Sequence, residues 1–146
     1  MDFNNLEQKI GVQFKNPSLL KQAFTHRSYL NENRHLDLGH NERLEFLGDA
    51  VLELVTTDFL YNKYPAKNEG DLTSLRSALV NTITISEVAS DLGFNDYLMM
   101  SRGESKDTGR ARQYILANTF ESVVGSIYLD SGYEAANRFI SACLLP

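Results

Sequence analysis

Residues His40 to Val55, HNERLEFLGDAVLELV, form the most strongly patterned stretch of the chain. At about 100° per residue, its apolar residues fall on one broad face of a helix. That predicted core face comprises Leu44, Leu47, Ala50, Val51, Leu54 and Val55. Glu42, Glu45 and Asp49 share a narrow stripe elsewhere on the same helix. The stretch is therefore predicted to be an amphipathic helix that turns three carboxylates away from the core.

These carboxylates repel one another, since like charges one turn apart on a helix cost on the order of a few tenths of a kcal/mol per pair. A helix that needed only a polar surface would interleave lysines with the acids. Taken alone, the stretch is explained most simply as a solvated acidic face. A binding site requires a second helix with oxygen ligands beside it.

A helix predicted over Tyr114 to Tyr128 supplies such a partner. Asn118 and Glu121 lie one turn apart on the face opposite its apolar residues. Gly125 follows one turn later, where a side chain would block close approach. If the two helices pack side by side, their acids and Asn118 can converge on a common pocket.

A pocket of carboxylate and amide oxygens suits Mg²⁺ or Mn²⁺. Zn²⁺ is disfavoured because the sequence holds no cluster of cysteine or histidine, and Ca²⁺ would need more ligands and loop carbonyls. Divalent ions held by carboxylates can activate water and stabilise the leaving oxygen at a phosphate. They would also supply positive charge to an acidic chain.

The composition fits one domain with a substantial core, since the chain has 146 residues, of which 42% are hydrophobic. A formal net charge of -5 argues against a nucleic-acid partner unless cations cluster locally or metal ions offset the acids. The single Cys143 can form no internal disulfide, and no apolar run reaches the roughly 18 residues of a membrane span. The first residues lack the pattern of a signal peptide. We expect a soluble, cytoplasmic protein without a membrane partner.

The rest of the chain has helical periodicity with hardly any alternating pattern, which predicts an all-α domain. Further helices are predicted over 4–11, from Pro17, over 72–83, 85–92 and 133–145. His26 is placed near the end of the helix that starts at Pro17. Tyr64-Pro65 is expected to end the opening helix, and Asp71 or Thr73 to cap the next one, with Glu69 just ahead.

Two further features have alternative explanations. Residues 101–113, SRGESKDTGRARQ, are predicted to form a mobile basic loop, which is either an ordinary solvated loop or a contact for phosphates. Its cations are Arg102, Lys106, Arg110 and Arg112. Phe46 falls between the acidic stripe and the core face, so it is either a ring at the core edge or a contact across a two-fold dimer axis.

The stretch His40 to Leu52, HNERLEFLGDAVL, resembles the signature motif of the ribonuclease III family along nearly its whole length. Residues 25–29 (THRSY), 69–71 (EGD) and 115–117 (ILA) with Glu121 follow in the family's order. The resemblance covers residues 1–146 as the catalytic endonuclease domain. The usual bacterial members append a double-stranded-RNA-binding domain that this chain does not contain, so the chain was shortened or resembles compact members without that domain.

The resemblance implies an all-helical homodimer that cleaves double-stranded RNA with Mg²⁺, for which Mn²⁺ substitutes. The products would have 5′-phosphate and 3′-hydroxyl ends with short 3′ overhangs, each subunit cutting one strand, in the processing of rRNA or mRNA. By position, the resemblance implies that Glu45, Asp49 and Glu121 bind metal and that Asp49 and Glu121 are the essential catalytic residues. Glu42 and Glu69 match further acids of the catalytic valley.

Three more positions acquire an expected role from the resemblance. Phe46 matches an aromatic residue that inserts into the partner subunit, and residues 101–113 match a segment that touches RNA. Asn118 departs from the family, which commonly has aspartate there. The amide can still bind Mg²⁺, although with one charge less. It is a tolerated variant, a substitution that traps a complex, or the mark of an impaired enzyme, and the retained acids favour the first.

The same resemblance leaves an alternative function open. A dimer that kept the fold but lost its chemistry would be a catalytically impaired RNA-binding or scaffold protein. The intact Glu45, Asp49 and Glu121 argue against this alternative.

Overall fold

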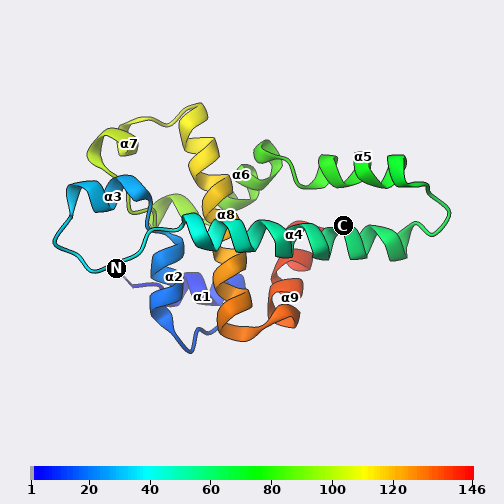
Figure 1. Ribbon diagram of the computed structural model, residues 1–146, viewed down its shortest axis with the longest axis horizontal. Coiled ribbons are helices and arrows are strands. Elements are labelled where there is room, and N and C mark those ends of the chain that lie inside the picture. The colour runs from blue at the N-terminus through cyan, green and yellow to red at the C-terminus, as the bar shows by residue number, and fades with distance from the viewer. Residues whose placement is uncertain (1) are drawn as a thin grey trace.

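The computed structural model describes residues 2–146, whose regular elements are all helical (Figure 1). They are α1 (Asn4–Ile10), α2 (Pro17–Ala23), α3 (Arg27–Glu32), α4 (Glu42–Lys63), α5 (Glu69–Leu79), α6 (Thr82–Asp91), the 3-10 turn η1 (Phe94–Asp96), α7 (Arg102–Lys106), α8 (Arg110–Ser131) and α9 (Tyr133–Cys143). The predicted all-α fold is confirmed. Among the described residues, strand-type pairing is limited to one isolated bridge between Thr25 and Met99. None of the helices in this part of the chain is both long and apolar enough to cross a membrane.

The two longest helices, α4 and α8, cross at the centre of the molecule (Figure 1). Their contact is the most extensive between any two elements. Glycines let the backbones touch at the crossing: a Cβ atom on Gly48 would overlap the carbonyl oxygen of Glu121, and one on Gly125 would overlap that of Leu44. Neither position can accept a side chain unless the helices move apart. Gly48 and Gly125 therefore set the distance between α4 and α8.

The start of α4 is fixed by the buried residue Asn41. Its side-chain amide donates to the carbonyl of Ala23 over 2.9 Å, and its backbone N–H donates to the carbonyl of Thr25 over 3.0 Å. Its own carbonyl accepts from the Ser122 hydroxyl over 3.1 Å. These bonds fasten the beginning of α4 to α2 on one side and to α8 on the other.

The buried face of α4 is rotated from the predicted one. Leu44, Val51 and Val55 are buried as predicted, but Ala50 and Leu54 are exposed. The other buried positions are Gly48, Leu52, Thr56 and Leu60. The reason is the close contact with α8, which turns the glycine side of α4 inward.

Helix α8 runs through the core: its predicted apolar face is buried and Asn118 and Glu121 stay partly exposed, but burial extends well beyond that face. It is buried at Ile115, Leu116, Ala117, Thr119, Phe120, Ser122, Val123, Val124, Gly125, Ser126 and Ile127. Serine hydroxyls are tolerated inside because they bond to backbone carbonyls: Ser126 donates to that of Val123 over 2.8 Å, and the one proton of Ser122 is shared between those of Asn118 and Asn41, at 2.9 Å and 3.1 Å. Gly125, predicted on the face away from the core, lies inside it.

Four local predictions are also corrected. His26 does not end α2 but caps α3, because its ring nitrogen accepts the N–H of Ser28. The helix predicted over 72–83 is two helices, because the Asn81 side chain accepts the N–H of Thr84 and starts α6. The cap of α5 is Asn68, which makes Glu69 the first residue of that helix. Residues 101–113 contain α7 and the first turn of α8 instead of a single loop.

Helix α5 folds back along the second half of α4, and the two extend from the rest of the molecule as a hairpin (Figure 1). Arg76 of α5 holds the hairpin together. It donates to the Thr57 hydroxyl over 2.9 Å and forms an ion pair of 3.5 Å with Glu53. No residue of α5 is buried. The hairpin therefore exposes much of its surface.

Candidate active site between α4 and α8

An open depression of about 610 Å³ lies where α4 crosses α8. It is lined by Glu42, Glu45, Phe46, Asp49, Asn118 and Glu121. The first four residues come from α4 and the last two from α8. The crossing at the glycines thus brings together the side chains that the sequence predicts to converge.

The electrostatics of this depression disfavour full ionisation of its acids. The pKa of Glu121 is raised to about 8, mostly by burial and in addition by the hydrogen bond with Asp49 and the charges of Asp49 and Glu45. Burial also raises the pKa of Glu45, with added repulsion from Glu42 and Asp49. At neutral pH, Glu121 therefore largely keeps its proton. A bound cation would favour the ionised forms instead.

The protein supplies little positive charge to these acids. Arg27 forms an ion pair of 3.5 Å with Glu42 at the edge of the depression, where both side chains are more than half exposed. Within residues 2–146, no ion pair joins Glu45, Asp49 or Glu121 to a basic side chain. The three inner acids therefore lack a counter-ion from the protein.

The donor set fits Mg²⁺ or Mn²⁺, because the lining offers carboxylate and amide oxygens without a thiol or an imidazole. The side chains do not yet surround a common point: among the described residues, no three Asp, Glu, His or Cys side chains enclose a position for a metal ion. The raised pKa of Glu121 means that a proton and a cation compete for its carboxylate oxygens.

Of two other predicted site residues, Glu69 lies outside the acidic depression and Phe46 lies at its edge. Glu69 begins α5 and lines a separate depression, which it shares with Tyr61 and Lys67 of the hairpin. Within one chain, Glu69 therefore does not reach the depression that holds Glu121.

Phe46 is 82% exposed at the edge of the acidic depression. It is not a ring at the core edge.

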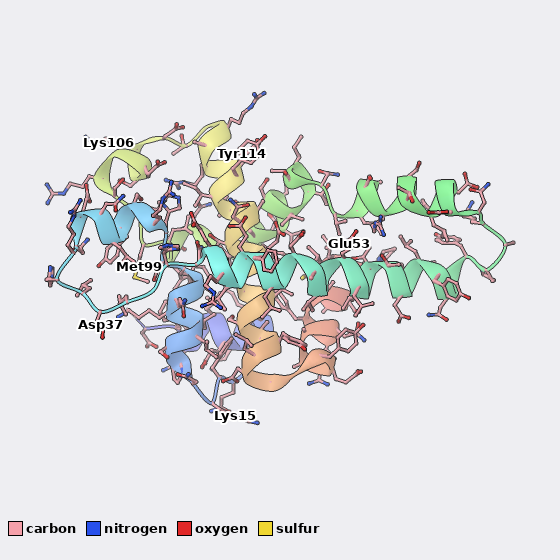
Figure 2. The ribbon with its side chains drawn as sticks, in the orientation of Figure 1. Lys15, Asp37, Glu53, Met99, Lys106 and Tyr114 are labelled. Carbon is pink, nitrogen blue, oxygen red and sulfur yellow. The ribbon has the colours of Figure 1, made fainter. Side chains whose placement is uncertain are left out.

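The basic residues of 101–113 are not equivalent. Arg102, Lys106 and Arg110 are exposed, and Figure 2 shows Lys106 on the outside of α7. The guanidinium of Arg112 instead donates to the side chain of Asn95 over 3.0 Å and to the carbonyl of Ser105 over 3.1 Å. Arg112 links α7 to the η1 turn, so part of its guanidinium is engaged within the protein.

Two residues that shape the site, Gly48 and Arg76, were not predicted from the sequence. The sequence did indicate a role for Gly48, because a glycine inside a helix often marks a place where another backbone approaches closely. Nothing in the sequence indicated a role for Arg76. It lines a neighbouring depression of about 340 Å³ with Asp49 and Glu121, and it does so only because α5 folds back on α4.

Comparisons with known proteins agree with this architecture. A family model described as Ribonuclease-III-like matches residues 16–146. Ribonuclease 3 of Bacillus licheniformis is 49% identical over 144 residues, which are 99% of this chain and 58% of that protein. Ribonuclease 3 of Listeria monocytogenes is 46% identical over 144 residues, or 99% of this chain and 63% of that protein. A solved nuclease domain of ribonuclease III from Campylobacter jejuni gives a TM-score of 0.86 at 38% identity, covering 97% of this chain and 98% of that one.

The fold and the site define an all-helical protein with an acid-lined depression at the crossing of its two longest helices. The chain belongs to the ribonuclease-III-like family. It spans 58% to 63% of the length of the two curated relatives named above. The Campylobacter jejuni domain is described as flexible in a region involved in dimer formation.

Proposed function

We propose that residues 1–146 form the endonuclease domain of a ribonuclease III type enzyme that cleaves double-stranded RNA with Mg²⁺ or Mn²⁺. The products would carry 5′-phosphate and 3′-hydroxyl ends with short 3′ overhangs, and the substrates would be rRNA or mRNA precursors. The observation that carries the proposal is the meeting of Glu45 and Asp49 with Glu121 in one depression. Relatives named Ribonuclease 3 supply the class of reaction.

In this mechanism, Glu45, Asp49, Asn118 and Glu121 would hold the divalent ion, which supplies a polarised water and neutralises charge on the phosphate. Hydrolysis adds the water oxygen to phosphorus and breaks the bond to O3′, which gives the proposed ends. Glu121 must first lose its proton, because carboxylates bind hard cations in the ionised form. The amide of Asn118 needs no such proton loss.

A homodimer is part of the proposal. Along its outer side, α4 exposes three large apolar residues about two turns apart: Phe46, Leu54 and Tyr61, which are 82%, 56% and 70% exposed. Such a stripe is typical of an interaction surface, and a two-fold axis would pair it with itself in antiparallel order. Each protomer would then cut one strand.

The antiparallel pairing also gives Glu69 a place in the site. Phe46 lines the acidic depression, whereas Tyr61 and Glu69 line the depression at the far end of the hairpin. Pairing Phe46 of one protomer with the opposite end of the partner's α4 would bring Glu69 of the partner subunit toward the acids. The valley would thus be completed by the second copy.

The proposal is tested by incubating a labelled duplex RNA with the protein and Mg²⁺. We expect cleavage that Asp49→Asn and Glu121→Gln each abolish. Asp58→Asn, which removes an exposed acid farther along α4, is the matched control and should cleave normally. Undiminished cleavage by either of the first two variants would refute the site.

A second candidate function, a catalytically impaired RNA-binding or scaffold dimer, has one observation in its favour: an amide at residue 118 lines the depression in place of the acid expected there. The same assay separates the two functions. The scaffold would bind the duplex and leave it intact even at high Mn²⁺ concentration.

A further inference from the structure

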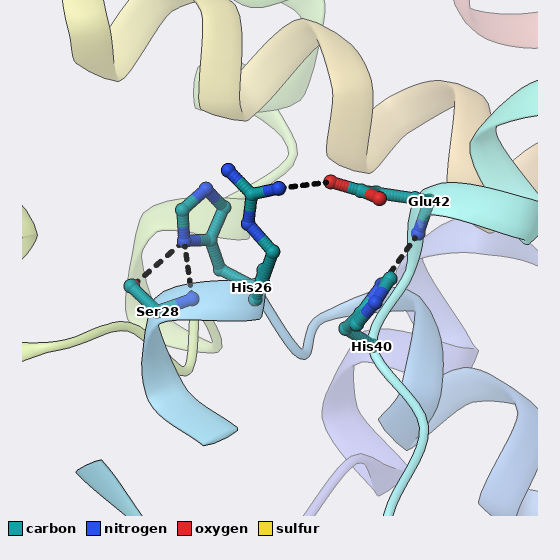
Figure 3. Close-up of polar contacts among 5 residues, drawn as sticks. His26, Ser28, His40 and Glu42 are labelled. Carbon is teal, nitrogen blue, oxygen red and sulfur yellow. Dashed lines mark hydrogen bonds and ion pairs between the residues drawn. The ribbon is translucent and has the colours of Figure 1, made fainter. Parts of the chain in front are cut away.

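Helix α3 begins with a hydrogen-bonded cluster that the proposed mechanism does not use (Figure 3). The backbone N–H of Ser28 donates to Nδ1 of His26 over 3.2 Å, and the Ser28 hydroxyl lies 2.7 Å from the same nitrogen. A ring nitrogen that accepts from a backbone N–H carries no proton of its own, so the neutral ring holds its proton on Nε2. Burial lowers the pKa of His26, which favours this neutral form. His26 therefore presents one N–H donor at Nε2.

This donor lies beside a cation that is largely free. Within residues 2–146, no hydrogen bond occupies Nε2 of His26. The neighbouring Arg27 has a side chain that is 66% exposed, and its charged contact is the ion pair with Glu42. A guanidinium has five N–H donors, so this ion pair leaves most of them available. The charge of Arg27 lies close enough to His26 to lower the pKa of the ring.

The cluster lies between the acidic depression and the basic helix α7. On one side, Arg27 contacts Glu42, which lines the depression. On the other side, the Ser28 hydroxyl accepts the backbone N–H of Ser101 over 2.9 Å, and the Ser101 side chain caps α7. A nucleic-acid strand that runs from the depression to the exposed cations of α7 would pass over His26 and Arg27.

We propose that His26 and Arg27 form a phosphate-binding site for the RNA backbone, beside the acidic depression. The site rests on the proposed function, because the ligand is the duplex that the acids would cut. The Nε2–H group would donate one hydrogen bond to a phosphate oxygen, and the guanidinium would add charge-assisted bonds. Glu42 and Glu104 are the acids near His26, and Arg27 and His40 are the basic groups near it. Arg27 offsets Glu42 locally, so Glu104 is the remaining acid near the phosphate site.

Two variants separate the two contacts from the fold. His26→Asn keeps a side-chain acceptor at the cap of α3, where asparagine is among the best residues, but removes the ring N–H. Arg27→Gln removes the charge from an exposed side chain. Lys15→Gln is the matched control, because it removes the same charge from an exposed residue before α2, at a different edge of the molecule from α7 (Figure 2).

The measurement is the affinity for a duplex RNA, followed by fluorescence anisotropy over a series of KCl concentrations, with each variant made in the uncleaving Glu121→Gln background. Arg27→Gln should reduce the slope of log affinity against log salt by about 0.9, because one phosphate contact fewer releases one counter-ion fewer. His26→Asn should weaken binding by roughly three- to tenfold without a change of slope, because a neutral ring displaces no counter-ion. Lys15→Gln should change neither quantity.

Each result decides between the proposals. If the Glu121→Gln parent binds the duplex but His26→Asn and Arg27→Gln behave like Lys15→Gln, the phosphate site is overturned and the proposed function stands. If the parent fails to bind the duplex at any salt concentration, the phosphate site is overturned, and duplex cleavage by the unmodified protein decides the proposed function separately. Thermal melting shows whether a variant is folded. If His26→Asn melts at a lower temperature than the parent, the phosphate site is judged only by the change that Arg27→Gln makes in the slope of log affinity against log salt.

Discussion

Asn118 is the one amide among the acids of the depression, and its charge can be restored. Asn118→Asp adds an anionic ligand, and the affinity of oxygen sites for divalent cations rises with ligand charge. We expect the Mg²⁺ concentration for half-maximal cleavage to fall roughly tenfold. A Mg²⁺ titration of duplex cleavage measures this, with Asp58→Asn as a control for net charge. An unchanged midpoint would mean that residue 118 does not contact the ion.

Glu121 should make the metal-free protein less stable as the pH rises. Its pKa is about 8 in the folded protein against an ordinary 4.5, so between these values the folded state holds a proton that the unfolded state has lost. The free energy of unfolding therefore falls with pH. The stability contributed by the proton on Glu121 is complete below pH 4.5 and is lost as the pH rises through about 8. Glu121 is partly open to solvent, so we expect a loss of about 2 kcal/mol.

Urea denaturation in EDTA at about pH 5.5 and about pH 8.5 tests this effect. Glu121→Gln cannot ionise, so its stability should change less between the two pH values than that of the unmodified protein. Parallel pH profiles would contradict the prediction. Mg²⁺ should also stabilise the unmodified protein more at the higher pH, since protons compete with the ion for the carboxylates.

The candidate site was predictable at the residue scale where helical spacing alone decides it. Glu45, Asp49 and Glu121 recur at spacings that place them on defined faces of two helices, and the structure brings them into one depression. Their unequal burial, which raises the pKa of Glu121 most, depends on how α8 sits in the core. No spacing rule contains that information.

At the scale of elements, the crossing of α4 and α8 depends on glycine. Gly48→Ala would place a methyl group against the carbonyl oxygen of Glu121 and within 2.8 Å of the backbone nitrogen of Gly125. We expect a loss of about 3 kcal/mol in unfolding free energy, with loss of cleavage as the acids separate. Gly70→Ala in α5 is the control: its nearest neighbour is 3.4 Å away, and alanine there should be neutral or stabilising by up to about 1 kcal/mol. Equal stability of the two variants would show that the crossing is not tight.

Helix α7 provides a second test, because two of its neighbouring arginines should differ. Arg112→Gln removes the bonds to Asn95 and Ser105, so α7 should loosen and trypsin should cut residues 102–110 faster. Arg110→Gln removes an exposed cation, so proteolysis at the remaining sites should be unchanged while duplex binding weakens. If both variants resist trypsin like the parent, Arg112 does not hold α7.

The elements predicted well are those whose signals are local. Helix α4 is long and ends where Tyr64 precedes Pro65, as predicted. Helix α7 was missed because its five polar residues have no apolar period, and its cap is a single hydroxyl of Ser101. The break before α6 was missed because apolar spacing continues across Asn81, although that side chain starts a new helix. Hydrophobic periodicity predicts neither the side-chain hydrogen bonds that cap a helix nor the depth at which a helix lies in the core.

At the scale of the whole molecule, the hairpin of α4 and α5 and the stripe on α4 matter together. A chain whose Glu69 lies in one depression and whose Glu121 lies in another cannot complete the proposed valley alone. A two-fold copy would resolve this separation and would cover Phe46, Leu54 and Tyr61 at the same time. Assembly and catalysis are therefore predicted to depend on the same face of α4.

Phe46→Glu tests that dependence. The substitution places a charge at one end of the proposed α4 stripe, where burial against the partner without a counter-charge is costly, so the protein should become monomeric. Sedimentation equilibrium measures the mass, and duplex cleavage should fall although Glu45, Asp49 and Glu121 are untouched. Leu129→Glu, at another exposed apolar residue with 54% exposure on α8, should remain a dimer and cleave normally. A dimer that persists in Phe46→Glu would exclude the α4 stripe as the contact, and a monomer that still cleaves would separate catalysis from assembly.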